Sequence, residues 1–106
     1  MLAYTVRCTF QDEDIARDWV IWLRDEHLAE VVTAGAMDAE VLWLDPTDAE
    51  GSVTCQVCYH FPSREAFESY ERDHASRLRE EGLRKFPLER GLVYARSTGE
   101  VVVRAG

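Results

Sequence analysis

Hydrophobic and polar positions alternate in two segments of the chain. In the first ten residues, mostly polar side chains separate the apolar Leu2, Tyr4, Val6, Cys8 and Phe10. A period of two with one apolar face predicts a half-buried strand over residues 2–10. The same period over residues 52–61 predicts a second strand, with apolar positions at Val53, Cys55, Val57, Tyr59 and Phe61. Two less regular strands are predicted over residues 92–98 and over residues 37–44, where Leu42, Trp43 and Leu44 suggest burial on both sides.

Helical spacing of apolar residues predicts two helices. In the first, the core-facing stripe is Ile15, Trp19, Trp22 and Leu23. This helix should begin at Asp12 as N-cap and run to about His27, with residues 28–33 continuing it or forming a short second turn before Gly35. The second helix should begin after Ser63, with Gly82 as a possible break, and its inner face should carry Phe67, Tyr70, His74 and Leu78.

The predicted order is β-α-β-β-α-β, which favours one ferredoxin-like α+β domain over residues 1–106. Right-handed crossovers place both helices on one face of the sheet and leave the other face open. A chain of 106 residues buries a modest core, so we expect a homodimer that packs through this open face. The pattern assigns to the open face Thr5, Arg7, Thr54, Gln56, Cys58, His60, Tyr94 and Arg96. Residues 101–103 either extend the last strand or form an arm.

The charge balance excludes several kinds of partner. Twenty acidic and twelve basic residues give a net charge of −8, which disfavours nucleic acid and anionic membranes. No apolar run approaches the ~20 residues of a membrane span, and the N-terminus does not resemble a signal peptide. Three cysteines give no disulfide framework, so a reducing, cytoplasmic location is expected.

The pair Glu26-His27 is the first candidate for chemistry. An acid and an imidazole at a helix end, near two tryptophans, suit general acid–base catalysis. The alternative is that Glu26 pairs with a neighbouring arginine and that His27 only interacts favourably with the helix C-terminus. His74, within the apolar stripe of the second helix, is interpreted as a hydrogen-bonded core residue.

The open sheet face supplies the second candidate, a ligand-binding set of Arg7, Gln56, His60, Tyr94 and Arg96. Its arginines suit a carboxylate or enolate, although hydrogen bonds across an interface explain the same residues. Cys55 and Cys58 lie three apart on a strand and point to opposite faces, so neither a metal site nor a disulfide is expected from them. No known phosphate, dinucleotide or zinc-protease motif is present, so no metal and no cofactor are predicted. A composite site, with Glu26 and His27 on one wall and open-face residues on the other, would require the two sets to meet at the sheet edge.

The motifs Trp19-x-x-Trp22-x-x-x-Glu26-His27, Pro62-Ser63-Arg64-Glu65 and Tyr70-x-x-x-His74-Ala75-x-x-Leu78-Arg79-x-x-Gly82 resemble those of small bacterial proteins in a domain-of-unknown-function family. The resemblance covers nearly the whole chain and implies membership of the dimeric α/β-barrel superfamily. The polar residues of the open face favour binding of a small organic molecule in a semi-polar pocket on the sheet face. The resemblance to the superfamily implies the alternative, a cofactor-independent monooxygenase or isomerase that acts on an activated carbonyl or aromatic compound.

Overall fold

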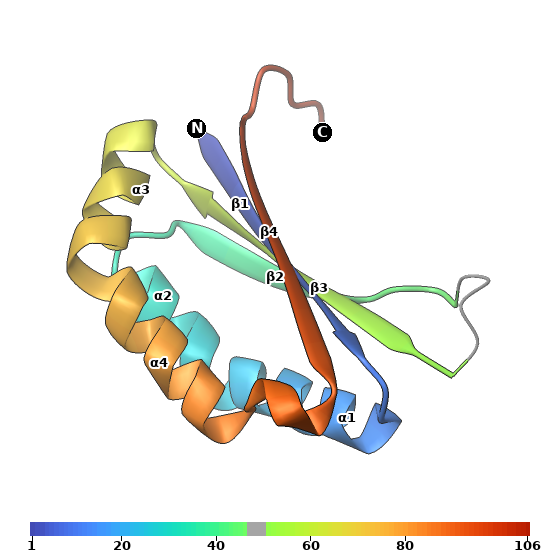
Figure 1. Cartoon of the computed structure of the whole chain (residues 1–106). Helices are drawn as coiled ribbons and strands as arrows, with labels where there is room; N and C mark the ends of the chain where they lie inside the picture. Colours follow the sequence, from blue (N-terminus) through green and yellow to red (C-terminus); the bar gives the residue numbers. More distant parts are fainter. Residues whose placement is uncertain (47–50) are drawn as a thin grey trace.

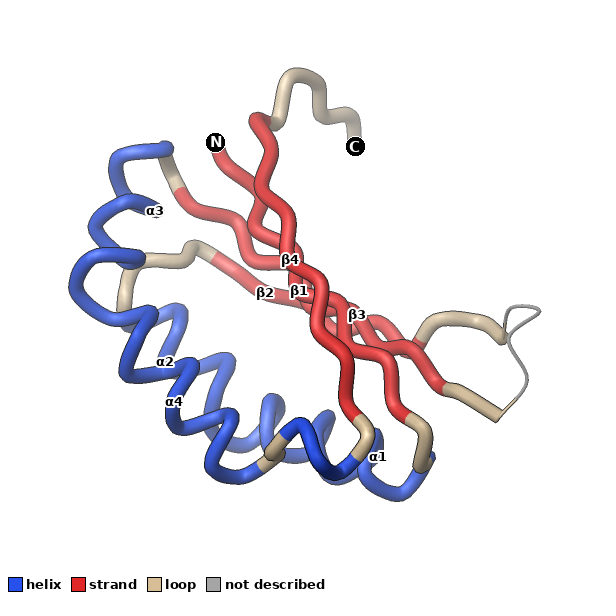
Figure 2. Tube along the Cα trace, viewed as in Figure 1, coloured by secondary structure: helices blue, strands red, loops and turns tan. Residues whose placement is uncertain are grey.

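The computed structural model describes residues 1–46 and 51–106, which form a four-stranded antiparallel sheet covered by helices on one face (Figures 1 and 2). The sheet order is β2-β3-β1-β4. The strands are β1 (Leu2–Phe10), β2 (Asp38–Trp43), β3 (Val53–Phe61) and β4 (Leu92–Glu100). This arrangement confirms the predicted ferredoxin-like α+β fold.

The first helical segment is continuous but contains a wider turn. It consists of α1 (Glu13–Trp22), the π-helical turn η1 (Leu23–His27) and α2 (Leu28–Thr33). Asp12 caps its start, because its Oδ1 accepts a hydrogen bond from the backbone N–H of Asp14 at 2.8 Å. Gly35, with a φ of 133°, follows its end. The predicted start and the predicted continuation past His27 are both confirmed.

The second helical segment repeats this construction with α3 (Arg64–Tyr70), the π-helical turn η2 (Glu71–Ala75) and α4 (Ser76–Lys85). The extra residue of a π turn rotates the following side chains about the helix axis. Ala75 is therefore buried, whereas His74 is half-exposed and its Nδ1 lies 3.4 Å from Arg77 Nη2. The interpretation of His74 as a core residue was wrong, and so was the suggested break at Gly82, which the helix passes.

The core lies between the helices and the sheet. Its largest fully buried side chains include Trp19, Tyr59, Phe10 and Phe61. The end of β2 is not part of it: Leu42 and Trp43 are 40% and 42% exposed, because β2 is an edge strand. The prediction that this end is buried on both sides was wrong.

The register of β4 corrects the predicted open face. Tyr94 lies opposite Cys8 and Arg96 opposite Val6, so both project toward the helices. Their assignment to the open face was wrong by one residue, since Leu92 is buried while Val93 is 66% exposed. The remaining members of the predicted set are correctly placed, and from β4 the open face receives Val93, Ala95 and Ser97.

Beyond β4 the chain leaves the sheet. The N–H of Val101 donates to the carbonyl oxygen of Met1 at 2.9 Å, and no regular element follows. A short 3₁₀ turn, η3 (Leu88–Arg90), connects the second helical segment to β4. Among the residues described, no helix has both the length and the apolar character needed to cross a membrane.

Candidate functional site

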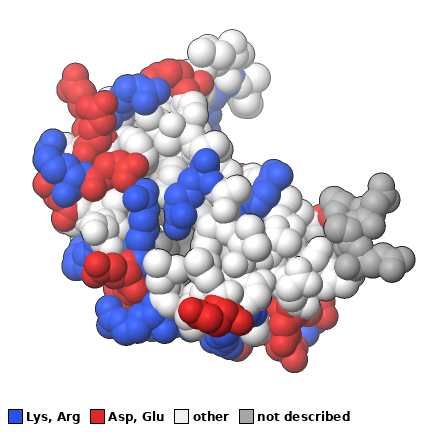
Figure 3. Space-filling view, in the orientation of Figure 1, with Lys and Arg blue, Asp and Glu red and all other residues white. Residues whose placement is uncertain are grey.

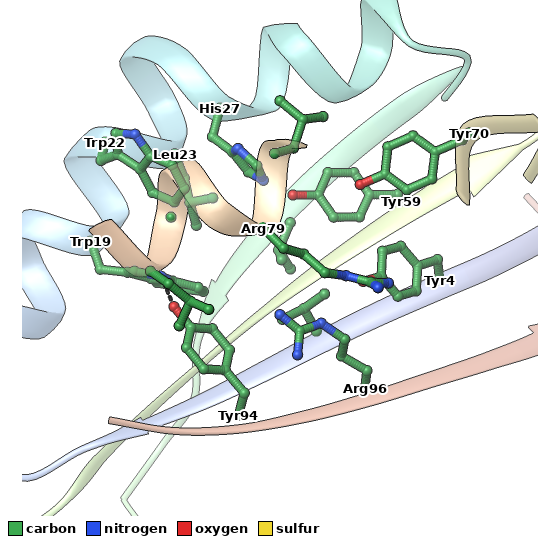
Figure 4. A pocket seen from close by; sticks show the side chains of 15 residues that line it. Tyr4, Trp19, Trp22, Leu23, His27, Tyr59, Tyr70, Arg79, Tyr94 and Arg96 are labelled. Atoms are coloured by element: carbon green, nitrogen blue, oxygen red, sulfur yellow. Dashed lines mark hydrogen bonds between the residues drawn. The ribbon is translucent and has the colours of Figure 1, made fainter. Parts of the chain in front are cut away.

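A cavity lies between the helical layer and the sheet (Figure 4), and its volume is about 50 Å³. Three parts of the chain line it. From the sheet come Tyr4, Val6, Val57, Tyr59, Tyr94 and Arg96; from the first helical segment Trp19, Trp22, Leu23 and His27; and from the second Tyr70, Leu78, Arg79, Gly82 and Leu83. The cavity therefore forms where both helical segments pass over the middle of the sheet.

His27 is the last residue of the first π turn and points into the cavity (Figure 4). Its ring stacks on Trp22, with 4.4 Å between centroids and 23° between planes. Its Nδ1 is buried and has no hydrogen-bond partner. Burial lowers the pKa of His27 to about 4, despite an opposing effect of Glu81, so the imidazole is neutral at pH 7.

Arg79 enters the cavity from α4. Its Nη2 donates to Glu71 Oε2 at 3.0 Å and lies 3.5 Å from the hydroxyl of Tyr4. Its Nε is buried without a partner. In the described part of the chain, the buried side-chain nitrogens or oxygens without a partner are Trp22 Nε1, His27 Nδ1 and Arg79 Nε, and all three belong to residues that line this cavity.

Three tyrosines add neutral hydroxyl groups. Burial raises the pKa of Tyr59, and it raises the pKa values of Tyr70 and Tyr94 to about 12. The hydroxyl of Tyr94 accepts a hydrogen bond from Trp19 Nε1 at 3.1 Å (Figure 4). All three hydroxyls are therefore protonated near pH 7 and able to donate hydrogen bonds.

The charge around the cavity is positive. Arg96 lies with its guanidinium 5.0 Å from the ring centroid of Tyr94 and forms no ion pair with any described residue. The lining contains two arginines and no carboxylate, in a chain whose net charge is −8. Figure 3 shows Lys and Arg side chains beside a hollow near the centre of this face.

The structure brings together only part of the predicted site. His27, Tyr94 and Arg96 line the cavity, whereas Glu26 lies outside it, with its Oε2 3.0 Å from Lys85 Nζ. The sheet separates this cavity from the other predicted residues, which form pairs on the open face: Arg7 Nη2 with Gln56 Oε1 at 2.7 Å and His60 Nδ1 with Asp38 Oδ1 at 2.7 Å. The predicted composite site is therefore two separate groups of residues.

Sequence reasoning missed Arg79, Tyr59 and Tyr70 as cavity residues. Tyr59 and Tyr70 fell on faces assigned to the core, which was correct but incomplete. Arg79 directly follows the buried Leu78 in the sequence. A regular helical period, extended through the π turn, does not place Arg79 on the side of the helix that faces the sheet. The position of Arg79 thus depends on the extra residue of η2.

The cysteines lie apart from this cavity's lining and are all free. Cys8 and Cys55 are buried on the helix side, where burial raises their pKa values to about 12 and about 11. Cys58 lies on the opposite face of β3. No group of three or more potential metal ligands from His, Cys, Asp and Glu occurs within residues 1–46 and 51–106.

The chain belongs to a protein family described as a domain of unknown function (DUF4286), whose model matches residues 1–97. This confirms the resemblance to a domain-of-unknown-function family. A search of curated protein sequences found no match.

Several solved structures share the fold. Two are dimeric ferredoxin-like proteins from an uncultured marine organism. One is 15% identical with a TM-score of 0.71, and the match covers 99% of this chain and 98% of the marine protein. The other is 15% identical with a TM-score of 0.68, and the match covers 98% of this chain and 97% of the marine protein. A third is MhuD, a heme-degrader from Mycobacterium tuberculosis with two hemes in its active site; it is 15% identical, has a TM-score of 0.60 and covers 98% and 99%. At these identities, the similarity establishes the fold alone.

Proposed function

We propose that the protein binds a small organic molecule in the cavity between the helices and the sheet, with His27, Tyr94 and Arg96 among the contacting residues. The observation that carries this proposal is the location of Nδ1 of His27 and Nε of Arg79. A buried polar group without a partner costs about 1–3 kcal/mol, so native proteins rarely keep one. These two groups, with Trp22 Nε1 as a third, belong to residues that line one cavity, and a ligand that completes their hydrogen bonds accounts for them.

The ring-rich lining supports an organic ligand rather than water alone. Trp19, Trp22 and Tyr59 provide broad apolar surfaces beside the polar atoms. Binding sites for small molecules combine this kind of surface with a few polar groups that fix orientation. We therefore place the pocket on the helix side of the sheet and not on the open face favoured by the sequence.

The indole N–H signals in an NMR titration test this proposal. Phenol and benzoate serve as a neutral and an anionic probe. Trp19 and Trp22 line the cavity, whereas Trp43 lies at the sheet edge outside it and is the internal control. We expect at least one probe to shift the signals of Trp19 and Trp22 more than that of Trp43. If neither probe moves the first two signals, the cavity is not a ligand site.

A second candidate function is a cofactor-independent isomerase or monooxygenase that acts on an activated carbonyl or aromatic compound. It is favoured by one observation: a neutral imidazole and two guanidinium groups share one cavity. His27 would remove a proton next to a carbonyl group, and Arg79 or Arg96 would stabilise the enolate. An isomerase returns this proton to another carbon. In a monooxygenase the carbanion instead adds to O₂, and the protonated peroxide loses water to leave a carbonyl group, so that the substrate itself supplies the electrons.

Exchange of carbon-bound hydrogen in D₂O tests the proton-removal step common to both reactions. With acetoacetate as probe, we expect the protein to accelerate deuterium incorporation and His27→Phe to abolish the acceleration. The control is Arg84→Gln, an exposed position on the same helix as Arg79 and outside the cavity, which should retain it. Equal rates for the native protein and His27→Phe would contradict a catalytic role of His27.

We further propose a cytoplasmic homodimer that packs through the open sheet face. No helix in the described part of the chain covers this face, and it exposes Leu42 and Val93 at 40% and 66%. Similarity to the marine proteins, which are described as dimeric, supports the homodimer. We expect the interface to bury more than about 1,200 Å² in total.

Light scattering on two variants tests this assembly. Val93→Asp places a charge on the open face, and Leu88→Asp places one on the exposed 3₁₀ turn, where Leu88 is 54% exposed. We expect a dimer for the native protein and for Leu88→Asp, and a monomer for Val93→Asp. A native monomer at micromolar concentration would rule the assembly out.

A further inference from the structure

We propose that the ligand of this cavity is a small organic anion, whose carboxylate or enolate lies between Arg79 and His27 while the rest of the molecule lies beside Tyr94 and Arg96. This inference rests on the function proposed above and adds the chemical class of the ligand. Three features support it: the charge of the lining, its excess of hydrogen-bond donors, and the shape of the available space.

The first feature is an uncompensated positive charge. Arg79 is paired with Glu71 at 3.0 Å, so these two charges largely offset one another. Arg96 has no acidic partner among residues 1–46 and 51–106, and the cavity lining contains no Asp or Glu. With Arg79 offset by Glu71, the lining itself keeps the positive charge of Arg96, and Glu81 acts on His27 from outside the lining, within a chain of net charge −8. A partly enclosed site with this excess attracts anions although the whole molecule repels them.

The second feature is the number of donors that lack an acceptor. Arg79 Nε–H has no partner, and no hydrogen bond joins the hydroxyl of Tyr59 or Tyr70 to another described residue. Arg96 adds further N–H groups at the mouth. Against these donors, the acceptors are one nitrogen of the neutral His27 ring and the oxygens of the tyrosine hydroxyls, each of which also carries a donor, whereas the arginine N–H groups only donate. A ligand that satisfies this lining must therefore be rich in acceptors, as a carboxylate or enolate is.

Arg79 is also held in place for such a contact. Glu71 and the hydroxyl of Tyr4 both engage its Nη2, which fixes the plane of the guanidinium. Its Nε is left without a partner, on a side chain that lines the cavity (Figure 4). Charge-assisted hydrogen bonds from a guanidinium to an oxyanion are about twice as strong as neutral ones. A fixed donor of this kind gives an anion both affinity and orientation.

The third feature is size. A volume of 50 Å³ is roughly a third of that of an engineered cavity that binds benzene. The enclosed volume of the cavity thus accommodates a small polar head group rather than a whole ring. The rest of the ligand must lie toward the mouth, where the guanidinium of Arg96 stacks on Tyr94. Arg96 and Leu83 are exposed, so a change of side-chain rotamer at either residue would widen the mouth.

Two matched pairs of probes test the class of ligand. Benzoate and benzamide have nearly the same shape but differ in charge, as do acetate and acetamide. NMR titrations that follow the indole signals of Trp19 and Trp22 give their affinities. We expect each anion to bind at least about ten-fold more tightly than its amide. In Arg96→Gln this preference should fall below about three-fold, and in Arg84→Gln it should stay unchanged.

The outcomes separate this inference from the proposed function. If an amide shifts the signals of Trp19 and Trp22 at the same or lower concentration than its acid, the cavity binds ligands but not preferentially anions, and the inference is wrong. An undiminished preference in Arg96→Gln would also overturn it. If no probe moves these signals, both the function and the inference fail. Arg79→Gln gives a second measurement, and Arg96→Gln at the exposed edge strand carries the test if Arg79→Gln does not fold.

Discussion

Protonation of His27 should make the stability of this protein fall as the pH is lowered. Burial lowers the pKa of His27 from its ordinary 6.5 to about 4 in the folded protein. Between these two values the unfolded chain binds more protons than the folded one, so the free energy of unfolding decreases with decreasing pH. The contribution of neutral His27 to the free energy of unfolding is therefore fully present above about pH 6.5, and it is lost progressively as the pH falls to about 4.

The size of the effect follows from the pKa shift. A decrease of the pKa from 6.5 to about 4 corresponds to about 3 kcal/mol of unfolding free energy at full protonation. Between pH 7 and pH 4.5, the expected loss due to His27 is about 2 kcal/mol. His27→Phe keeps a ring against Trp22 but cannot be protonated, so this part of the pH dependence should disappear.

Urea denaturation at pH 7 and pH 4.5 measures this difference. The quantity to compare is the loss of unfolding free energy between the two pH values, because effects of other groups then cancel between the native protein and His27→Phe. His74→Gln is the control, since His74 lies in the second π turn, one residue before its end, and is half-exposed. We expect it to behave like the native protein. Equal pH dependence in His27→Phe and the native protein would show that His27 is not held neutral by burial.

Three further predictions concern packing and the cysteines. Trp22→Ala should lower the free energy of unfolding by about 3–5 kcal/mol in urea melts, because Trp22 is 7% exposed; a loss below about 1 kcal/mol would contradict its place in the core. Gly82→Ala should not stabilise the native protein, although alanine has a higher helix propensity than glycine, because a Cβ at this position would lie 3.2 Å from Trp22 Cη2. In a Trp22→Ala background, where this contact is absent, the same substitution should raise the free energy of unfolding by up to about 1 kcal/mol. Cys55 and Cys58 should form no disulfide with each other and bind no metal, which thiol titration and metal analysis can check; stoichiometric zinc that disappears in Cys55→Ser would be evidence against this.

Local sequence patterns were sufficient to predict the order of elements and both helix N-caps. The alternation in β1 and β3 is unambiguous, because every second residue of each strand is apolar and faces the helices. Asp12 and Ser63 carry side-chain oxygens that accept N–H groups of the first helical turn, as N-caps commonly do. These features depend only on neighbours along the chain.

The cavity depends on features that local patterns do not encode. A π turn adds one residue to a helical period, so Ala75 faces the core in place of the predicted His74 and Arg79 was missed, whereas Leu78 was placed correctly. On β4, Leu92 and Val93 are both apolar, and only pairing with β1 decides which of them faces the helices. The choice between Leu92 and Val93 also decides which face of the sheet Tyr94 and Arg96 lie on. Placing these two residues in one cavity with His27 therefore required the pairing register of β4 with β1.

The central claim is that the cavity around His27 and Arg79 is where a ligand binds. Nuclear Overhauser effects between bound benzoate and the protein test it most directly. We predict contacts from benzoate protons to the ring protons of His27 and Tyr94. Contacts only to open-face residues such as Thr5 and Cys58, which lie on the other side of the sheet, would contradict the account.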